Sequence, residues 1–341
     1  MDVDAIVDRV REQEEERKAA AEDVREQLDA ADDAVPFIHQ VAPATPDDTV
    51  IAGVDGGLAR RSFHGLDVVL TRAVAPVFTY RDGGLDAADY VPERSPSPTI
   101  ETVAGGMDRD SVNRLATLQR LQEEIEAATQ AVADADMLLL DGSLVPQPQD
   151  RPDNDSPLFD QYENVIDQYR ALYAAAEENG TVLAGVVEDS RSAHLAEALS
   201  NHGVDPSAVA DIRDTVLLSY LLDHGERTVT VRYSDRETPV MDDIGVTADD
   251  IGVFYLAAAK NDRPIRIELY RHADHDVDAV AGELLGVTGA DHSYAVPPVL
   301  VEADQRAALS QADVELVTKR ITAKLAHLPG VSELRRDRRP F

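Results

Sequence analysis

The chain of 341 residues is 43% hydrophobic, enough to bury a substantial core in one large domain or two modest ones. It contains no cysteine, which excludes disulfides and thiolate-bound metals, and no apolar run approaches the ~20 residues of a membrane-spanning helix. The first residues lack the basic start and apolar stretch of a signal peptide, so we expect a cytoplasmic protein.

The formal net charge of −33 is ordinarily unfavourable for nucleic-acid binding, because neutralising phosphates requires cationic side chains. The acidic residues are spread along the chain among intact apolar segments, which argues against disorder. The only lysines are Lys18, Lys260, Lys319 and Lys324. An acidic, lysine-poor, cysteine-free chain resembles proteins of salt-accumulating haloarchaea. Since the Debye length falls to about 3 Å at 1 M salt, this charge indicates the solvent and does not exclude a polyanionic partner.

Apolar residues at near-helical spacing predict a helix over residues 1–33. We interpret residues 1–48 as an N-terminal helical arm, whose charged residues form either a solvated face or a surface for a partner helix. The main body begins at residue 49. The apolar segments 50–54, 68–75 and 77–80 predict three strands of an antiparallel meander.

The pattern then alternates between helices and strands. A helix is predicted over 108–133, and after it a strand at 137–140, a further helix, a strand at 182–187, a helix at 192–199, a segment at 228–233, strands at 251–256 and 264–269, and a helical part at 299–328. Three antiparallel strands followed by helix, strand, helix and strand are typical of an RNase H-like α/β fold, with a mixed sheet flanked by helices. We predict one such domain over residues 49–328 and a basic tail over 329–341.

Two of the predicted strands end in an aspartate that is followed by glycine, at Asp55 and Asp141. Because functional groups collect where buried strands leave the core, we expect these two carboxylates to lie close together. Carboxylate oxygens are ligands that suit a hard divalent cation such as Mg²⁺ or Mn²⁺. The glycines beside them are expected to let the backbone approach a phosphate, and they are Gly56, Gly57 and Gly142.

The helix over 108–133 offers a third carboxylate. Glu124 and Glu126 lie on opposite flanks of its apolar stripe, whereas Glu123 is expected to point into solvent. Periodicity alone does not choose between the two flanking acids. Three carboxylates at one edge of the sheet are suited to hold two divalent ions about 3.5–4 Å apart, which together clamp a scissile phosphate.

Four segments of the sequence, IAGVDGG, LLLDGSL, LAGVVEDSRS and YAVPPVLVEADQRAAL, resemble the archaeal NurA nuclease family in their order and separation. The resemblance runs from about residue 49 to 325. It implies a DNA nuclease that depends on Mn²⁺ and acts as a 5′-to-3′ exonuclease and single-strand endonuclease. It also implies a ring-like homodimer that works with a hexameric HerA-type translocase, an ATPase, in DNA end resection and repair.

The resemblance also assigns site residues. The metal-binding acids of the family match Asp55, Glu124 and Asp141, so the resemblance selects the first of the two flanking acids. The late tyrosine of the family matches Tyr294. The family usually carries histidine where this chain has Asp304; an aspartate can ligate Mg²⁺ or Mn²⁺, but it puts any proton-transfer role of the histidine in doubt. The spacing from the tyrosine to this aspartate is also stretched.

Three further features remain open. Glu188 and Asp189 stand where the family commonly has a basic residue, and we favour halophilic substitution over an addition to the metal site. The segment 272–276, with two histidines and two aspartates, is interpreted as an acidic loop and not as a metal cluster. The arginine-rich segment 335–339 is either a contact for DNA or the translocase, or a frayed solvated end.

Two other functions compete with the nuclease. A non-catalytic partner could retain the fold and dock on the translocase, and Asp304 in place of histidine favours this alternative slightly. A sugar-kinase-like or actin-like phosphotransferase also begins with a strand that ends in Asp-Gly. That class repeats the motif in a second half with a Gly-rich phosphate loop, and the sequence contains no such half.

Overall fold

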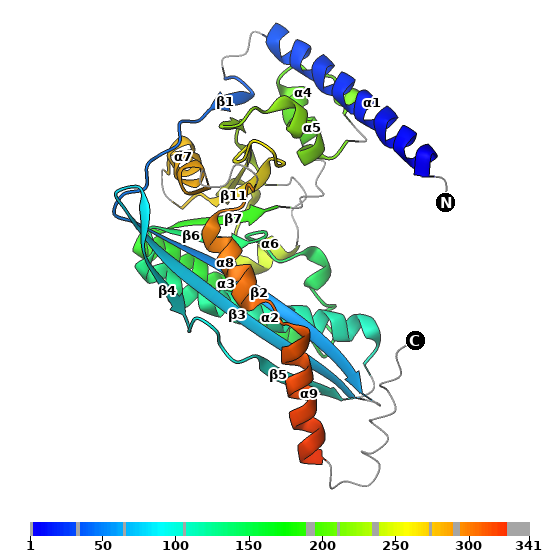
Figure 1. Cartoon of the computed structure of the whole chain (residues 1–341), viewed down its shortest axis with the longest axis vertical. Helices are drawn as coiled ribbons and strands as arrows, with labels where there is room; N and C mark the ends of the chain where they lie inside the picture. Colours follow the sequence, from blue (N-terminus) through cyan, green and yellow to red (C-terminus); the bar gives the residue numbers. More distant parts are fainter. Residues whose placement is uncertain are drawn as a thin grey trace.

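A computed structural model describes residues 3–325 except 32–34, 64–65, 105–106, 189–194, 210–211, 234–238, 273–274 and 289–293. Eleven strands of this described part form one mixed sheet in the order β1-β8-β10-β11-β7-β6-β2-β3-β4, with β5 beside β3 and β9 beside β10. Helices lie on both faces of the sheet (Figure 1). Within the same residues, no helix combines the length and apolar character needed to cross a membrane.

The strands and helices have these bounds. The strands are β1 (Ile38–Gln40), β2 (Thr49–Phe63), β3 (Leu66–Arg81), β4 (Gly84–Val91), β5 (Thr99–Ala104), β6 (Met137–Asp141), β7 (Val182–Val187), β8 (Glu226–Thr228), β9 (Val231–Arg232), β10 (Ile251–Leu256) and β11 (Ile265–Tyr270). The helices are α1 (Val3–Ala30), α2 (Arg109–Ala131), α3 (Phe159–Asn179), α4 (Leu195–Asn201), α5 (Asp214–Leu221), α6 (Pro239–Ile244), α7 (Val277–Thr288), α8 (Pro298–Ala307) and α9 (Gln311–Leu325). Short 3₁₀ turns lie at Val132–Asp134, Pro148–Asp150, Pro206–Ala208 and Ala248–Asp250.

The predicted RNase H-like arrangement is confirmed. Strands β2, β3 and β4 form an antiparallel meander, and β6 and then β7 add in parallel to β2. Helix α2 begins where Asp108 caps it, with the carboxylate accepting a hydrogen bond from the Ser111 N–H. The predicted helical C-terminal part is two helices, α8 and α9, and the structure adds α7 before them.

The prediction of separate strands at 68–75 and 77–80 was wrong, because both belong to the single strand β3. Pro76, which divides the two segments in the sequence, pairs with Tyr90 of β4. The ladder to β2 on the other side skips from Ala52↔Val77 to Asp55↔Val74. Since proline has no N–H to donate, the ladder is interrupted at this point while the strand continues.

The prediction that the first strand ends at Val54 was also wrong. Strand β2 continues to Phe63, and its residues beyond Asp55 remain paired with β3 in a long hairpin. Only the parallel pairing of β2 with the shorter strand β6 ends at Val54, and the last pair is Val54 with Leu140. Figure 1 shows this hairpin extending well past β6, with β5 and α9 beside its far part.

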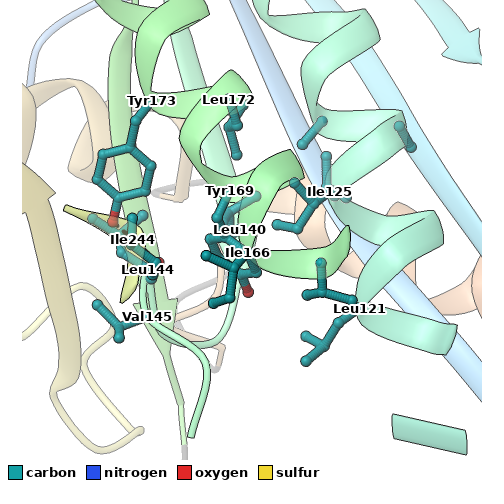
Figure 2. Close-up of a cluster of buried hydrophobic side chains, with 14 of the residues drawn as sticks. Leu121, Ile125, Leu140, Leu144, Val145, Ile166, Tyr169, Leu172, Tyr173 and Ile244 are labelled. Atoms are coloured by element: carbon teal, nitrogen blue, oxygen red, sulfur yellow. Dashed lines mark hydrogen bonds between the residues drawn. The ribbon is translucent and has the colours of Figure 1, made fainter. Parts of the chain in front are cut away.

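Two hydrophobic layers cover the central strands. On one face α2 and α3 pack against alternate residues of β6, and Figure 2 shows Leu121 and Ile125 of α2 facing Ile166 and Tyr169 of α3 around Leu140. On the other face, α7 and α8 pack against the residues in between. This alternation of side chains along buried strands determines which functional residues face which helix layer.

The N-terminal residues lie at the end of the sheet that β1 and β8 form. In α1, Ala21 and Val24 are buried, in a cluster shared with α4 and α5, whereas the earlier turns expose valine and isoleucine side chains. Strand β1 comes next and pairs antiparallel with β8. The basic tail lies outside the described residues.

Candidate metal centre

Asp55 and Asp141 lie side by side in the sheet, because each directly follows the last paired residue of two neighbouring parallel strands, Val54 and Leu140. Alternation places Asp141 on the same face as Leu139, which packs in the core layer of α7 and α8. Asp55 shares its face with Gly53, against which α8 packs. Both carboxylates therefore project toward the α8 side.

Helix α8 brings Asp304 to the same place. A Cβ atom on Gly53 would lie within 3.0 Å of Val299, and one on Gly57 would overlap the carbonyl oxygen of Ala307. The helix thus runs along β2 from residue 53 to residue 57, with Asp304 on its exposed flank beside the intervening Asp55. The charge of Asp304 acts on both Asp55 and Asp141.

The structure separates the two candidate acids of α2. Glu124 is buried, with 3% of its surface exposed, whereas Glu126 is exposed. The prediction that Glu123 points into solvent was wrong: it is half-buried, and its carboxylate accepts a 2.8 Å hydrogen bond from the Thr71 hydroxyl of β3. The helix contacts β3 as well as β2 and so covers a broader face than its apolar stripe indicated.

Glycines at this site allow helices to approach the sheet. A Cβ atom on Gly56 would lie 2.9 Å from the Glu124 carboxylate and 2.9 Å from Arg120 of the same helix. Gly56 and Gly57 therefore leave room for α2 and α8, and the expectation that they hold the backbone open to a phosphate was wrong. Gly142 fits that expectation better, since nothing lies within 4 Å of the position of its missing Cβ.

Negative charge is concentrated here. Partial desolvation raises the pKa of Asp141 to about 7, with further contributions from Asp55, Asp304 and Glu188. Burial raises the pKa of Asp55, and the charge of Asp304 adds to this rise. The hydrogen bond from the Gly56 N–H and the charge of Arg120 oppose it. The carboxylates repel one another at short range, and a bound dication would relieve this repulsion.

Arg120 partly compensates this charge. Its guanidinium forms an ion pair with Glu124, one helical turn further along α2. Burial nevertheless raises the pKa of Glu124 to about 8. Arg120 opposes this rise, whereas Asp55 and Asp141 add to it. One cation is thus shared among several carboxylates. Arg120 was not among the residues predicted from the sequence, although the i, i+4 spacing from Glu124 could have indicated the pair.

Tyr294 lies at the rim of this cluster. Its hydroxyl donates to the Glu188 carboxylate over 3.4 Å, and 38% of its surface is exposed. Burial and Glu188 raise its pKa, with smaller contributions from Asp141 and Asp304. The structure therefore brings Tyr294 and all four predicted acids into one region. It also brings Glu188 there, whereas Asp189 lies outside the described residues.

The donor set suits Mg²⁺ or Mn²⁺, since every candidate ligand is a carboxylate oxygen. Among the described residues, no three acidic or histidine side chains already stand at the spacing of a metal site. Asp55, Asp141, Glu124 and Asp304 are the side chains that could close around an ion.

The other candidate cluster offers less. In segment 272–276, His272 and His275 approach each other with 3.4 Å between their Nε2 atoms, and His272 stacks on Tyr270. Asp274 of the same segment lies outside the described residues. Burial and the neighbouring His275 lower the pKa of His272. The interpretation of this segment as an acidic loop stays a prediction.

Comparisons with known proteins concern the family and the fold of the chain. Residues 49–309 match the NurA domain family. The NurA nuclease from Sulfolobus solfataricus superposes with a TM-score of 0.61 at 17% identity, over 94% of this chain and 97% of that chain. A NurA structure bound to dAMP and manganese gives a TM-score of 0.56 at 10% identity, over 97% of this chain and 96% of that chain.

A further NurA structure, with manganese, gives a TM-score of 0.56 at 10% identity, over 95% of this chain and 98% of that chain. At these identities the likeness shows a shared fold, and no curated protein matches the sequence significantly. The match to the domain family covers most of the chain and includes Asp55, Glu124, Asp141, Tyr294 and Asp304. The chain belongs to the NurA family.

Proposed function

We propose that this protein is a DNA nuclease that hydrolyses phosphodiester bonds with two Mn²⁺ or Mg²⁺ ions. The observation that carries the proposal is the concentration of carboxylates at the junction of β2 and β6, where burial and mutual repulsion raise the pKa of Asp55, Glu124 and Asp141. Such an excess of negative charge destabilises a fold unless a bound cation neutralises it. Structures of NurA proteins with manganese support the choice of metal.

Each residue has a proposed part in the reaction. Two bound ions would supply an activated water and stabilise the leaving oxygen. Asp55 and Asp141, fixed on neighbouring strands, would hold ions from the sheet side, and Glu124 and Asp304 would hold them from α2 and α8. Tyr294, at the exposed rim, would orient the DNA backbone through its hydroxyl.

Finer properties are proposed from the family resemblance. They are 5′-to-3′ exonuclease and single-strand endonuclease activity, action as a homodimer in the cytoplasm, and cooperation with a hexameric HerA-type translocase in end resection. The NurA structure bound to dAMP supports a DNA substrate for this chain. The high negative charge is compatible with DNA binding at molar salt, where the charges are screened.

The test is digestion of end-labelled single- and double-stranded DNA in molar KCl with Mn²⁺, Mg²⁺ or EDTA. We expect degradation with Mn²⁺, loss of degradation with EDTA, and a loss of at least about 100-fold in Asp141→Asn, since even residues that only support a ligand are worth 10–100-fold. Asp136→Asn is the matched control at the opposite end of β6, where the carboxylate accepts a hydrogen bond from the Val50 N–H.

Activity with EDTA equal to that with Mn²⁺, or full activity of Asp141→Asn, would contradict the metal mechanism. No cleavage by the folded protein, alone and with its translocase, would favour the non-catalytic docking function.

A further inference from the structure

A carboxylate outside the metal-binding set, Glu268 of β11, is fully buried, with none of its surface exposed. It lies on the side of β11 that also carries Arg266 and Tyr270, opposite the apolar side of Ile265, Ile267 and Leu269. A buried charge is expensive unless it is paired and hydrogen-bonded, so its partners indicate its role. Those partners lie in the turn directly after Asp141.

Strand register explains how the turn reaches Glu268. Strands β6, β7 and β11 are neighbours, and Glu268 pairs with Gly185 of β7. A Cβ atom on Gly185 would lie 2.5 Å from the carbonyl oxygen of Gly142 and 3.0 Å from the Leu144 nitrogen. Because residue 185 has no side chain, the turn after Asp141 can cross β7 at this point and contact β11.

One oxygen of Glu268 holds the turn. Its Oε2 atom accepts a 2.9 Å hydrogen bond from the backbone N–H of Leu144 and a 2.8 Å hydrogen bond from the Ser143 hydroxyl. The Gly142 N–H donates to the carbonyl oxygen of Val186 over 2.9 Å. Three consecutive residues after Asp141 are thus bonded to the two adjacent strands.

The Ser143 hydroxyl has a complete set of partners. Since its hydrogen goes to Glu268, the 3.1 Å contact with the Tyr233 hydroxyl places Tyr233 as the donor, and the Val145 N–H donates to the same oxygen over 3.2 Å. The Tyr173 hydroxyl donates to the Leu144 carbonyl oxygen over 3.1 Å, and Figure 2 shows this side chain reaching from α3 toward the turn. The turn is therefore constrained from both sheet and helix.

The charge of Glu268 is balanced away from the turn. Its other oxygen, Oε1, lies 2.7 Å from the Nη2 atom of Arg266, whose guanidinium also stacks over the Tyr233 ring. The ion pair occupies Oε1 and leaves Oε2 free to accept both bonds from the turn. A neutral acceptor would make weaker hydrogen bonds to the same donors.

We propose that Glu268 is a positioning residue that fixes the carboxylate of Asp141 for metal binding by clamping the turn from Gly142 to Leu144. This inference rests on the proposed function, in which Asp141 is a metal ligand. Asp141 itself is at the solvent-exposed end of β6, and beyond the bond from Gly142 to Val186 the strand ladder no longer restrains the turn. The clamp replaces that restraint, as outer residues commonly do around metal ligands.

The experiment measures Mn²⁺ affinity by titration calorimetry on the full chain, together with thermal stability. In Glu268→Ala we expect Mn²⁺ affinity to fall roughly 10–100-fold, the range for residues that support a metal ligand. The matched control is Asp214→Ala. Asp214 is also a buried carboxylate that accepts hydrogen bonds from a backbone N–H, that of Leu195, and from a hydroxyl, that of Tyr255, but it lies in the distant cluster of α4 and α5.

The control should lose thermal stability and keep wild-type Mn²⁺ affinity. Glu268→Gln, with its amide oxygen in place of Oε2, can retain weaker forms of both bonds to the turn while it loses the ion pair, so its affinity should lie between those of Glu268→Ala and the wild type. Wild-type affinity in Glu268→Ala, an equal loss in Asp214→Ala, or a loss in Glu268→Gln as large as in Glu268→Ala would overturn the proposal.

If Glu268→Ala does not fold, Ser143→Ala carries the test. It deletes one of the two bonds, and a few-fold loss of affinity is expected, whereas unchanged affinity would overturn the clamp. The wild-type titration separates the two proposals. If the wild-type protein neither binds Mn²⁺ nor cleaves DNA, the proposed function fails; if it binds Mn²⁺ and these variants bind it equally well, only the role of Glu268 fails.

Discussion

Glu124 and Glu126 are two residues apart on α2, and the protein surrounds only the first of them. Glu124 is buried beside Gly56 and paired with Arg120, whereas Glu126 is exposed. We expect Glu124→Gln to reduce Mn²⁺-dependent cleavage by about 100-fold or more, because a ligand should matter at least as much as its supporting residues. Glu126→Gln should retain activity within about 2-fold.

The measurement is the initial rate of DNA cleavage at saturating Mn²⁺, with circular dichroism to establish folding. The two variants make the same chemical change on the same helix, so each controls for the other. A full loss in Glu126→Gln with activity retained in Glu124→Gln would reverse the assignment of the helix ligand.

A second prediction concerns the repulsion at Asp141. Without metal and at a pH above the Asp141 pKa of about 7, where this carboxylate is ionised, Asp141→Asn should be at least as stable as the wild type, because it removes one of several charges that repel Asp55 and Asp304. Saturation with Mn²⁺ at 100 times its dissociation constant should stabilise the wild-type protein by about 2.7 kcal/mol and the variant far less.

Thermal unfolding with EDTA and with Mn²⁺ measures both effects. Asp136→Asn is again the control and should respond to Mn²⁺ like the wild type. An Asp141→Asn variant that gains as much stability from Mn²⁺ as the wild-type protein would show that Asp141 is not a ligand.

At the scale of elements, the position of α8 depends on the glycines of β2. A side chain at Gly57 would meet the backbone of α8 at Ala307, which cannot move aside as a flexible side chain can. Gly57→Ala should therefore destabilise the protein by roughly 1–3 kcal/mol, typical of overpacking, and should also lower Mn²⁺ affinity because Asp304 shifts with the helix.

Chemical denaturation and Mn²⁺ titration test this prediction. Gly84→Ala is the control: it lies at the start of β4, and the nearest atom to its added Cβ is 3.8 Å away. If Gly57→Ala matches that control in both measurements, α8 is not held in register by β2 as described.

Elements differ in how well the sequence predicts them. Helix α2 and strands β6, β7, β10 and β11 have a clear period or a short apolar run, and their predicted bounds lie close to the observed ones. The β2–β3 hairpin was predicted poorly, since Gly56, Gly57 and Pro76 indicate breaks locally but are accommodated by pairing with neighbouring strands. Pairing partners are distant in sequence and have no local signature.

The same reason limits prediction of the site. Asp55 and Asp141 could be found because each follows a short apolar run, but their neighbours Arg120 and Glu268 could not be placed without the fold. Glu268 is the one acid in the segment Ile265–Tyr270, yet only the register of β7 and β11 shows that it meets the turn after Asp141. Local pattern gives candidates, and tertiary register selects among them.

For the whole molecule, the net charge of −33 should make stability depend on salt. Raising KCl from about 0.1 M to 1 M shortens the Debye length from about 10 Å to 3 Å, which screens repulsion across the surface. The free energy of unfolding should rise over this range. Sucrose at matched osmolality separates screening from general solute exclusion, since it carries no charge and should stabilise less.

Denaturant unfolding across the KCl series measures this dependence. Stability that is flat with KCl, or that rises equally with sucrose, would show that surface repulsion is not relieved by salt. In that case the acidic composition would need another explanation than adaptation to salt.

The position of α8 near the C-terminal end of the chain has a consequence for synthesis. Asp55, Glu124 and Asp141 leave the ribosome early, but Glu268 and Asp304 come more than 120 residues after Asp141. A nascent or prematurely ended chain therefore carries three of the acids without the strand that clamps the turn and without the fourth acid. If the proposed function holds, translation order delays the assembly of the metal centre until residue 304 has been made, and chains that end before it would lack nuclease activity.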